Sequence, residues 1–194
     1  MSAPVGEVRV DCPAWAAEVV DWDRAYGTDE ERMALAVRLA GENVDRGTGG
    51  PFGAAIFERS GRLVSIGVNS VVRLDNCTLH AEMVAFMLAQ RRVGSFTLAA
   101  PGLADHELFT SCEPCAMCLG ATLWSGVVRV VYAAAGEDAR ELGFDEGPVF
   151  AESHDYLRER GIELEGGILR EESRRVLARY RERAGPVYNR RPEG

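Results

Sequence analysis

The chain has 194 residues and a formal net charge of −8, and 46% of its residues are hydrophobic, which fits one globular domain with terminal extensions. The acidic balance disfavours tight binding to nucleic acid, because that binding comes mainly from phosphates neutralised by basic side chains. All 22 basic residues are Arg, which excludes a Schiff-base lysine and a P-loop lysine from the chemistry.

The first half of the chain predicts a helix followed by a β-hairpin. Residues 1–27 form an N-terminal extension in which Trp15 and Trp22 are expected to pack. Thr28 and the acidic residues after it are typical of a helix start, and apolar residues then recur at helical spacing until the glycines at 47–50. The segments 52–58 and 63–69 predict two strands joined by a tight turn.

The second half predicts helices that alternate with strands. Helices are expected over 79–92, from Pro114 at a first helical position to Trp124, and over 169–183; strands are expected over 107–111, 127–133 and 162–164. This alternation indicates an α/β layered fold. We expect a single domain over 1–194, with a catalytic core at 28–150 and a C-terminal strand, helix and tail at 151–194.

Two short motifs indicate a metal site with open coordination. His80 and Glu82 begin one predicted helix, and Cys115 and Cys118 begin another. Zinc favours Cys sulfur and His nitrogen in tetrahedral geometry, and a helix N-terminus stabilises thiolates. Three protein ligands leave one position for water, whose pKa zinc lowers to about 7. We therefore predict one zinc ion per chain, held by His80, Cys115 and Cys118, with Glu82 moving protons.

The remaining cysteines and histidines leave alternatives open. Cys77 and Cys112 could join the two motif cysteines in an iron–sulfur cluster, or the histidine and three cysteines could form a closed structural zinc site. Neither alternative explains Glu82 two residues after the histidine. Cys112 is expected at a strand end, pointing away from the metal. His106 and His154 lack ligand spacing and are expected at the surface.

The N-terminus and the cysteine content indicate a compartment. No basic segment followed by an apolar one opens the chain, so no signal peptide is visible. The longest nearly apolar stretch, 127–136, contains Arg129 and is too short to span a bilayer. Five cysteines, three of them within 112–118, fit a metal protein better than a secreted disulfide framework, so we expect a cytoplasmic protein.

The motifs together resemble the cytidine-deaminase superfamily over about residues 28–150. They are Gly50-Pro51-Phe52-Gly53-Ala54, Asn69, His80-Ala81-Glu82 and the segment 110–121. Within the superfamily the chain looks most like the bacterial guanine deaminases, on the basis of Trp124 and the segments 110–115 and 143–148. The segment Val187-Tyr188-Asn189-Arg190 resembles a branch that is also linked with ammeline deamination. The resemblance implies a three-layer α/β/α fold with a mixed five-stranded sheet, a homodimer, and zinc-dependent hydrolysis of guanine to xanthine and ammonia.

The same resemblance implies a set of substrate contacts. They are Phe52, Asn69, the backbone at Ala54 and Ala81, Trp124, Asp145, Glu146 and Tyr188. We favour Glu146 over Asp145 as the carboxylate that reaches the base and helps to expel ammonia. An amide such as Asn69 can donate and accept, and a carboxylate can accept from the N–H groups of a guanine edge, so the residue types fit such a substrate.

Several related functions remain alternatives. Guanosine, ammeline and cytosine present related amidine edges, and pocket shape decides among them. A tRNA adenosine deaminase shares the two metal motifs, but the resemblance is weaker beyond Cys118 and the net charge is unfavourable. A non-enzymatic zinc protein would have a closed metal site and would release no ammonia from any base.

Overall fold

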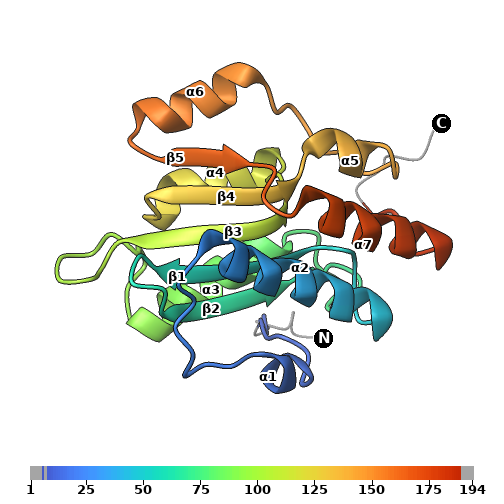
Figure 1. The fold of residues 1–194 in the computed structure, drawn as a ribbon, viewed down its shortest axis with the longest axis horizontal. Coiled ribbons are helices and arrows are strands. Elements are labelled where there is room, and N and C mark those ends of the chain that lie inside the picture. Colours follow the sequence, from blue (N-terminus) through green and yellow to red (C-terminus); the bar gives the residue numbers. More distant parts are fainter. Residues whose placement is uncertain (1–5, 7, 189–194) are drawn as a thin grey trace.

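The computed structural model describes residues 6 and 8–188, which form a five-stranded mixed sheet between two layers of helices (Figure 1). The strands are β1 (Gly53–Glu58), β2 (Leu63–Val68), β3 (His106–Cys112), β4 (Arg129–Ala134) and β5 (Glu163–Gly166), in the spatial order β2-β1-β3-β4-β5. Strand β1 runs antiparallel to β2 and β3, whereas β3, β4 and β5 are parallel. The predicted α/β fold with a mixed five-stranded sheet is confirmed.

Helices cover both faces of the sheet. They are α1 (Ala16–Val19), α2 (Asp29–Asp45), α3 (Ala81–Val93), α4 (Ala116–Ser125), α5 (Gly136–Arg140), α6 (Ala151–Glu159) and α7 (Arg170–Glu182). Helices α2 and α7 lie on one face, α3 and α4 lie on the other, and α6 lies beyond β5 at the sheet edge (Figure 1). The helix α2 begins as predicted, because Thr28 Oγ1 accepts from the backbone N–H of Glu31, whose side chain accepts from that of Thr28.

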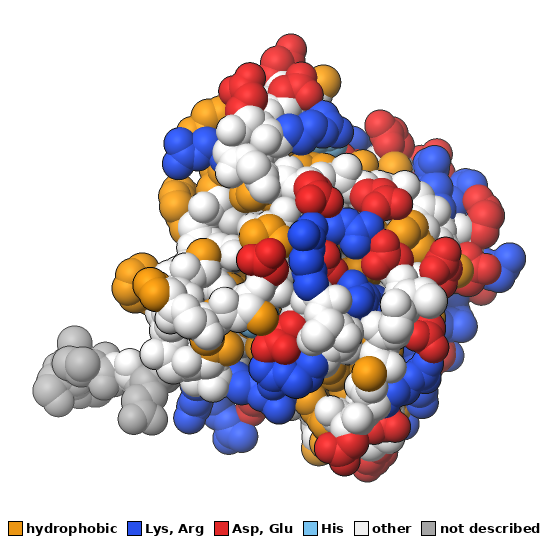
Figure 2. Space-filling view, turned by 60° about the vertical axis from the view of Figure 1, so that its left-hand side comes forward, with side chains coloured by type: hydrophobic (Ala, Val, Ile, Leu, Met, Phe, Trp, Pro, Cys, Tyr) orange, Lys and Arg blue, Asp and Glu red, His pale blue; other side chains and the backbone are white. Residues whose placement is uncertain are grey.

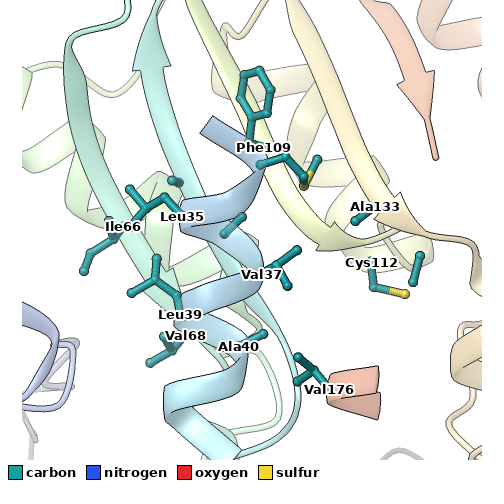
Figure 3. Close-up of a cluster of buried hydrophobic side chains, with 14 of the residues drawn as sticks. Leu35, Val37, Leu39, Ala40, Ile66, Val68, Phe109, Cys112, Ala133 and Val176 are labelled. Atoms are coloured by element: carbon teal, nitrogen blue, oxygen red, sulfur yellow. The ribbon is translucent and has the colours of Figure 1, made fainter. Parts of the chain in front are cut away.

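The core is divided by the sheet into two clusters. On the α2 and α7 face, Leu39 and Val176 pack towards Phe109 and Ile66 of the strands (Figure 3). On the other face, Leu108 packs with residues of α3 and α4. The neighbours Leu108 and Phe109 thus serve opposite clusters, as successive residues of a strand must, and both faces of β3 are buried.

The topology brings two helix N-termini to one end of the sheet. Strands β2 and β3 are both antiparallel to β1, so their carboxyl ends lie at the same edge. Helix α3 follows β2 through the loop 69–80, and α4 follows β3 after a short turn. Loops at the carboxyl ends of strands are where α/β folds place their ligands.

Four details differ from the sequence predictions. Pro114 precedes the helix instead of beginning it, because Cys115 is an extended N-cap and α4 starts at Ala116. The short helices α1, α5 and α6 were not predicted. His106 is buried, not exposed, because its Nδ1 bonds the Leu98 carbonyl oxygen at 3.0 Å. His154 is also largely buried, with Nε2 lying 3.0 Å from Oε1 of Glu113.

The surface carries interspersed charges. Figure 2 shows acidic and basic side chains side by side over one face of the molecule. Arg170 and Arg174 of α7 both pair with Asp138, and Arg179 pairs with Asp45, so basic side chains of the last helix are matched by acids of this chain. No helix within the described ranges has the length and apolar character needed to cross a membrane.

Candidate active site

Three side chains converge where α3 and α4 begin. His80 is the N-cap of α3, Cys115 is the N-cap of α4, and Cys118 lies in the first turn of α4. Their Nδ1 and two Sγ atoms all lie within 4.8 Å of one another. As N-caps, His80 and Cys115 lie just outside the helical backbone, so their side chains can turn towards a common point.

The spacing of these atoms suits a tetrahedral zinc ion. His80 Nδ1 lies 3.5 Å from Cys115 Sγ and 3.7 Å from Cys118 Sγ. Zinc–sulfur and zinc–nitrogen bonds of about 2.3 and 2.1 Å at a tetrahedral angle place sulfur and nitrogen about 3.6 Å apart. Among the described residues, only this group meets the geometry of a metal site, and Cys112 is not part of it. Three ligands leave one coordination position open, as a catalytic zinc site requires.

The thiols are already prepared to bind a cation. The hydrogen bond from Cys118 and the neighbouring His80 lower the pKa of the Cys115 thiol to about 4, against the opposing effect of burial. The pKa of Cys118 is raised in turn, because it gives its proton towards the Cys115 thiolate and is buried. A bound dication stabilises both thiolates, so it displaces the proton that the pair shares.

Glu82 lies beside the ligands without belonging to them. It is buried, with Oε1 accepting from the Thr110 hydroxyl at 3.1 Å and Oε2 lying 3.5 Å from Cys118 Sγ. Burial raises the pKa of Glu82, and a carboxyl of raised pKa is suited to taking and returning a proton near neutral pH. Thr110 fixes the orientation of this carboxyl from the neighbouring strand.

The two acidic candidates of the segment 143–148 occupy different environments. Glu146 is 8% exposed and lines a pocket beside the metal ligands, which we call the central pocket. Asp145 is exposed, and its Oδ1 accepts from the backbone N–H of Gly147 at 2.9 Å. Burial raises the pKa of Glu146 to about 8, and the nearby thiolate of Cys115 adds to this effect. A zinc ion would lower that pKa again.

Asn69 faces the same pocket with an unpaired donor. Its side chain is fully buried, and the amide nitrogen Nδ2 has no hydrogen-bond partner. The amide oxygen is used, because the backbone N–H of Gly50 donates to it at 3.4 Å. A buried polar group without a partner is costly, so the unpaired Nδ2 is evidence of an acceptor on a bound molecule.

Aromatic rings lie at the pocket and beside it. Phe52 lines it and contacts Phe144 edge to face, with ring centroids 5.1 Å apart. The Tyr188 ring centroid lies 5.1 Å from that of Phe144 and 6.5 Å from that of His80, in the same chain. The Tyr188 hydroxyl is buried against Gly50 and has no hydrogen-bond partner. Asn189 and Arg190, from the same C-terminal motif, lie outside the described residues.

The remaining predicted contacts are not at this pocket surface. Ala54 and Ala81 are fully buried, in β1 and at the start of α3, where they pack in the core cluster behind the pocket. Trp124 is 77% exposed near the end of α4 and does not line the pocket. The sequence suggested Trp124 only through its resemblance to relatives, and no local pattern indicates which way a single aromatic at a helix end points.

Sequence reasoning missed three residues that complete the site. Thr110 orients Glu82, and Glu113 lines the pocket while its Oε2 accepts from the Gly136 backbone N–H at 2.7 Å. Asn43, near the end of α2, is fully buried and bonds the Asn69 carbonyl. A polar residue among the apolar positions of α2 was the available signal for Asn43; nothing local indicated the other two.

Known proteins share this architecture. Residues 27–134, more than half of the chain, match the family described as the cytidine and deoxycytidylate deaminase zinc-binding region. The guanine deaminase of Bacillus subtilis (strain 168) is 42% identical over 133 residues, which cover 69% of this chain and 81% of that protein. The solved guanine deaminase from Nitrosomonas europaea is 38% identical with a TM-score of 0.86, over 91% of this chain and 97% of that chain. The structure of NE0047 in complex with 2,6-diaminopurine is 38% identical with a TM-score of 0.88, over 94% and 97%. The chain belongs to the zinc-binding cytidine and deoxycytidylate deaminase family.

Proposed function

We propose that this protein hydrolyses guanine to xanthine and ammonia. The observation that carries the proposal is the unpaired, buried Nδ2 of Asn69, which shares one pocket with Glu82, Glu146 and the metal ligands. The relatives add support, since the names of two of them state guanine deamination and NE0047 was solved with a diaminopurine. The donor set of His80, Cys115 and Cys118 fits zinc.

The chemistry requires a water, a proton carrier and an oriented base. Zinc held by the three ligands would act as a Lewis acid and activate the attacking water. Glu82 takes one proton from that water and gives it to ring nitrogen N3 as the oxygen bonds to C2 of guanine. The same carboxylate then carries the second water proton to the exocyclic amine, the C2–N bond breaks and ammonia leaves. The hydrogen bond from Thr110 keeps the Glu82 carboxyl in one orientation through both transfers.

Recognition of the base falls to the other wall of the pocket. Asn69 Nδ2 is a donor without a partner and suits a ring nitrogen or carbonyl of the base. Glu146 supplies a carboxyl that can accept from an N–H group, and it lies close enough to the metal ligands for the Cys115 thiolate to raise its pKa. Phe52 and Tyr188 place aromatic surfaces around the same space. The backbone at Ala54 and Ala81 would contact the base only if the base reaches past these side chains.

The test is ammonia release by the zinc-loaded protein from separate solutions of guanine, guanosine, ammeline and cytosine. Release from guanine with little from guanosine is expected, because the central pocket is small and Tyr188 packs beside its His80 wall, which leaves little room for ribose. Preferred release from another base would keep the zinc chemistry and reject guanine as the substrate. Absence of ammonia from every base, with zinc bound, would reject the enzyme assignment.

We also propose a cytoplasmic homodimer. The five cysteines are all free thiols, which suits a reducing compartment. An apolar groove between α4 and α6 is lined by Leu119, Leu123 and Tyr156, and Trp124 protrudes beside it. A second copy on this face would bury Trp124 and bring it near another chain. Sedimentation of the zinc-loaded protein as a monomer at micromolar concentration would contradict the dimer.

A further inference from the structure

A chain of hydrogen bonds connects the N-terminal extension to the backbone carbonyl of Asn69. Asn43 Nδ2 donates to the carbonyl oxygens of Gly50 at 2.8 Å and Asn69 at 3.0 Å. Asn43 Oδ1 accepts from the hydroxyl of Thr48 at 2.7 Å. That hydroxyl in turn accepts from Trp15 Nε1 at 3.1 Å. Trp15 is 6% exposed and Asn43 is fully buried, whereas Thr48 between them is half-buried.

The two ends of this chain of bonds set its direction. The indole N–H of Trp15 can donate but cannot accept, so the Thr48 oxygen must accept from it. The Thr48 hydroxyl then donates to Asn43, at 2.7 Å from Oδ1 and at 3.4 Å from the backbone carbonyl oxygen. The carbonyl oxygens of Gly50 and Asn69 can only accept, so the NH2 end of Asn43 faces them. A rotated Asn43 amide would place an oxygen against the carbonyl oxygens of Gly50 and Asn69.

The backbone of Asn69 is held at both of its polar groups. The Asn69 backbone N–H donates to the Phe52 carbonyl at 3.0 Å, so both backbone groups of Asn69 are bonded. Gly49 lies so close that a Cβ there would overlap the Asn69 carbonyl oxygen. With the backbone fixed and Oδ1 accepting from Gly50 N–H, the free Nδ2 is the end left for a ligand.

We propose that Trp15, Thr48 and Asn43 form a positioning relay that sets the direction of the Asn69 amide, so that the N-terminal extension is part of the substrate-binding machinery. The proposal rests on the proposed function for the identity of the base, but not for the direction of the amide. None of the three relay residues lines the central pocket, and they act only through Asn69. The relay holds the backbone of Gly50 and Asn69, and the Gly50 N–H that donates to Oδ1 leaves the donor end of the Asn69 amide for the base.

The test compares Thr48→Val with Thr48→Ser. Valine keeps the shape of threonine but leaves the Trp15 N–H and Asn43 Oδ1 unpaired, whereas serine keeps the hydroxyl. Loss of a buried hydrogen bond of this kind corresponds to about a tenfold rise in the KM for guanine. We expect that rise in Thr48→Val with a much smaller change in kcat and full zinc content, and a nearly normal KM in Thr48→Ser. Trp15→Phe, which keeps a smaller aromatic ring but removes the N–H, should lie between them.

A second measurement does not depend on the substrate. Heteronuclear NMR of the zinc-loaded protein without any base follows the side-chain amide of Asn69 and the indole N–H of Trp15. In wild type and Thr48→Ser the indole proton should exchange slowly with solvent, and in Thr48→Val it should exchange quickly and the Asn69 amide resonances should shift. Unmoved Asn69 resonances in Thr48→Val would overturn the relay. An inactive wild type with the expected resonance shifts would reject guanine as the substrate and leave the relay standing.

Discussion

The metal side and the base side of the central pocket are built in different ways. His80, Cys115 and Cys118 come from the N-termini of two helices, each marked by a short sequence motif, and the fold brings the two motifs together. Asn69, Glu146 and Tyr188 come from three segments far apart in sequence, each placed by contacts with other segments. The metal side thus depends on two motifs at helix starts, and the base side depends on single residues scattered along the chain. Substitutions on the first should abolish chemistry, and those on the second should change affinity and specificity.

The largest effect is expected from a ligand substitution. Cys118→Ser replaces a soft thiolate by a hydroxyl that binds zinc poorly, so metal content and ammonia release should both be lost. Cys112→Ser is the matched control, because Cys112 lies outside the ligand group although it lines the pocket. Zinc-to-protein ratios of the two purified variants check the prediction. Equal zinc content in both would contradict the assigned ligand set.

Glu82→Gln should lower kcat without changing the zinc content. The amide keeps the size of the carboxyl and its contact with Thr110 but cannot carry a proton. The loss in kcat should be on the order of a thousandfold, as for other removed proton carriers, with zinc fully bound. Steady-state kinetics with metal analysis on the same sample test this. A variant with nearly normal kcat would show that another group moves the protons.

Two substitutions test which of the two neighbouring acids contacts the base. Glu146→Gln replaces a buried carboxyl in the pocket by an amide. The variant should lower kcat/KM about a hundredfold, because a charged hydrogen bond to the base is lost. Asp145→Asn changes the neighbouring, exposed acid and should leave kcat/KM nearly unchanged. The kinetics of both variants with guanine decide between them. The opposite ranking would place Asp145 at the substrate.

The smallest effect is expected from substitutions of Tyr188. The Tyr188 hydroxyl bonds nothing, so Tyr188→Phe should change the KM for guanine by less than about twofold, whereas Tyr188→Ala removes the ring and should raise it several-fold. If Tyr188→Phe is as impaired as Tyr188→Ala, the hydroxyl itself contacts the substrate.

The same division explains what the sequence could predict. The capping residue Thr28 and the hairpin of β1 and β2 follow from local patterns, the His80, Cys115 and Cys118 group follows from two short motifs, and the structure agrees with them. The burial of His106 depends on a carbonyl at Leu98 in a loop, which no local pattern contains. The helix begins at Ala116, two residues after Pro114, because the cysteine between them serves as the N-cap.

The base side was harder to predict for the same reason. Asn69 was singled out by resemblance alone, and its unpaired donor is visible only when Asn43 and Gly50 are in place. Trp124 entered through the same resemblance and lies on the surface of the single chain. A resemblance transfers a residue type, but the burial and the hydrogen bonds around it have to be found in the fold.

Ammonia release from guanine by the zinc-loaded protein, measured beside Glu82→Gln at equal zinc content, tests the central claim most directly. We predict steady release by the wild type and a rate lower by about three orders of magnitude in the variant. Equal rates in the two proteins, or release that persists after zinc is removed, would contradict a zinc-dependent deaminase that uses Glu82 as its proton carrier.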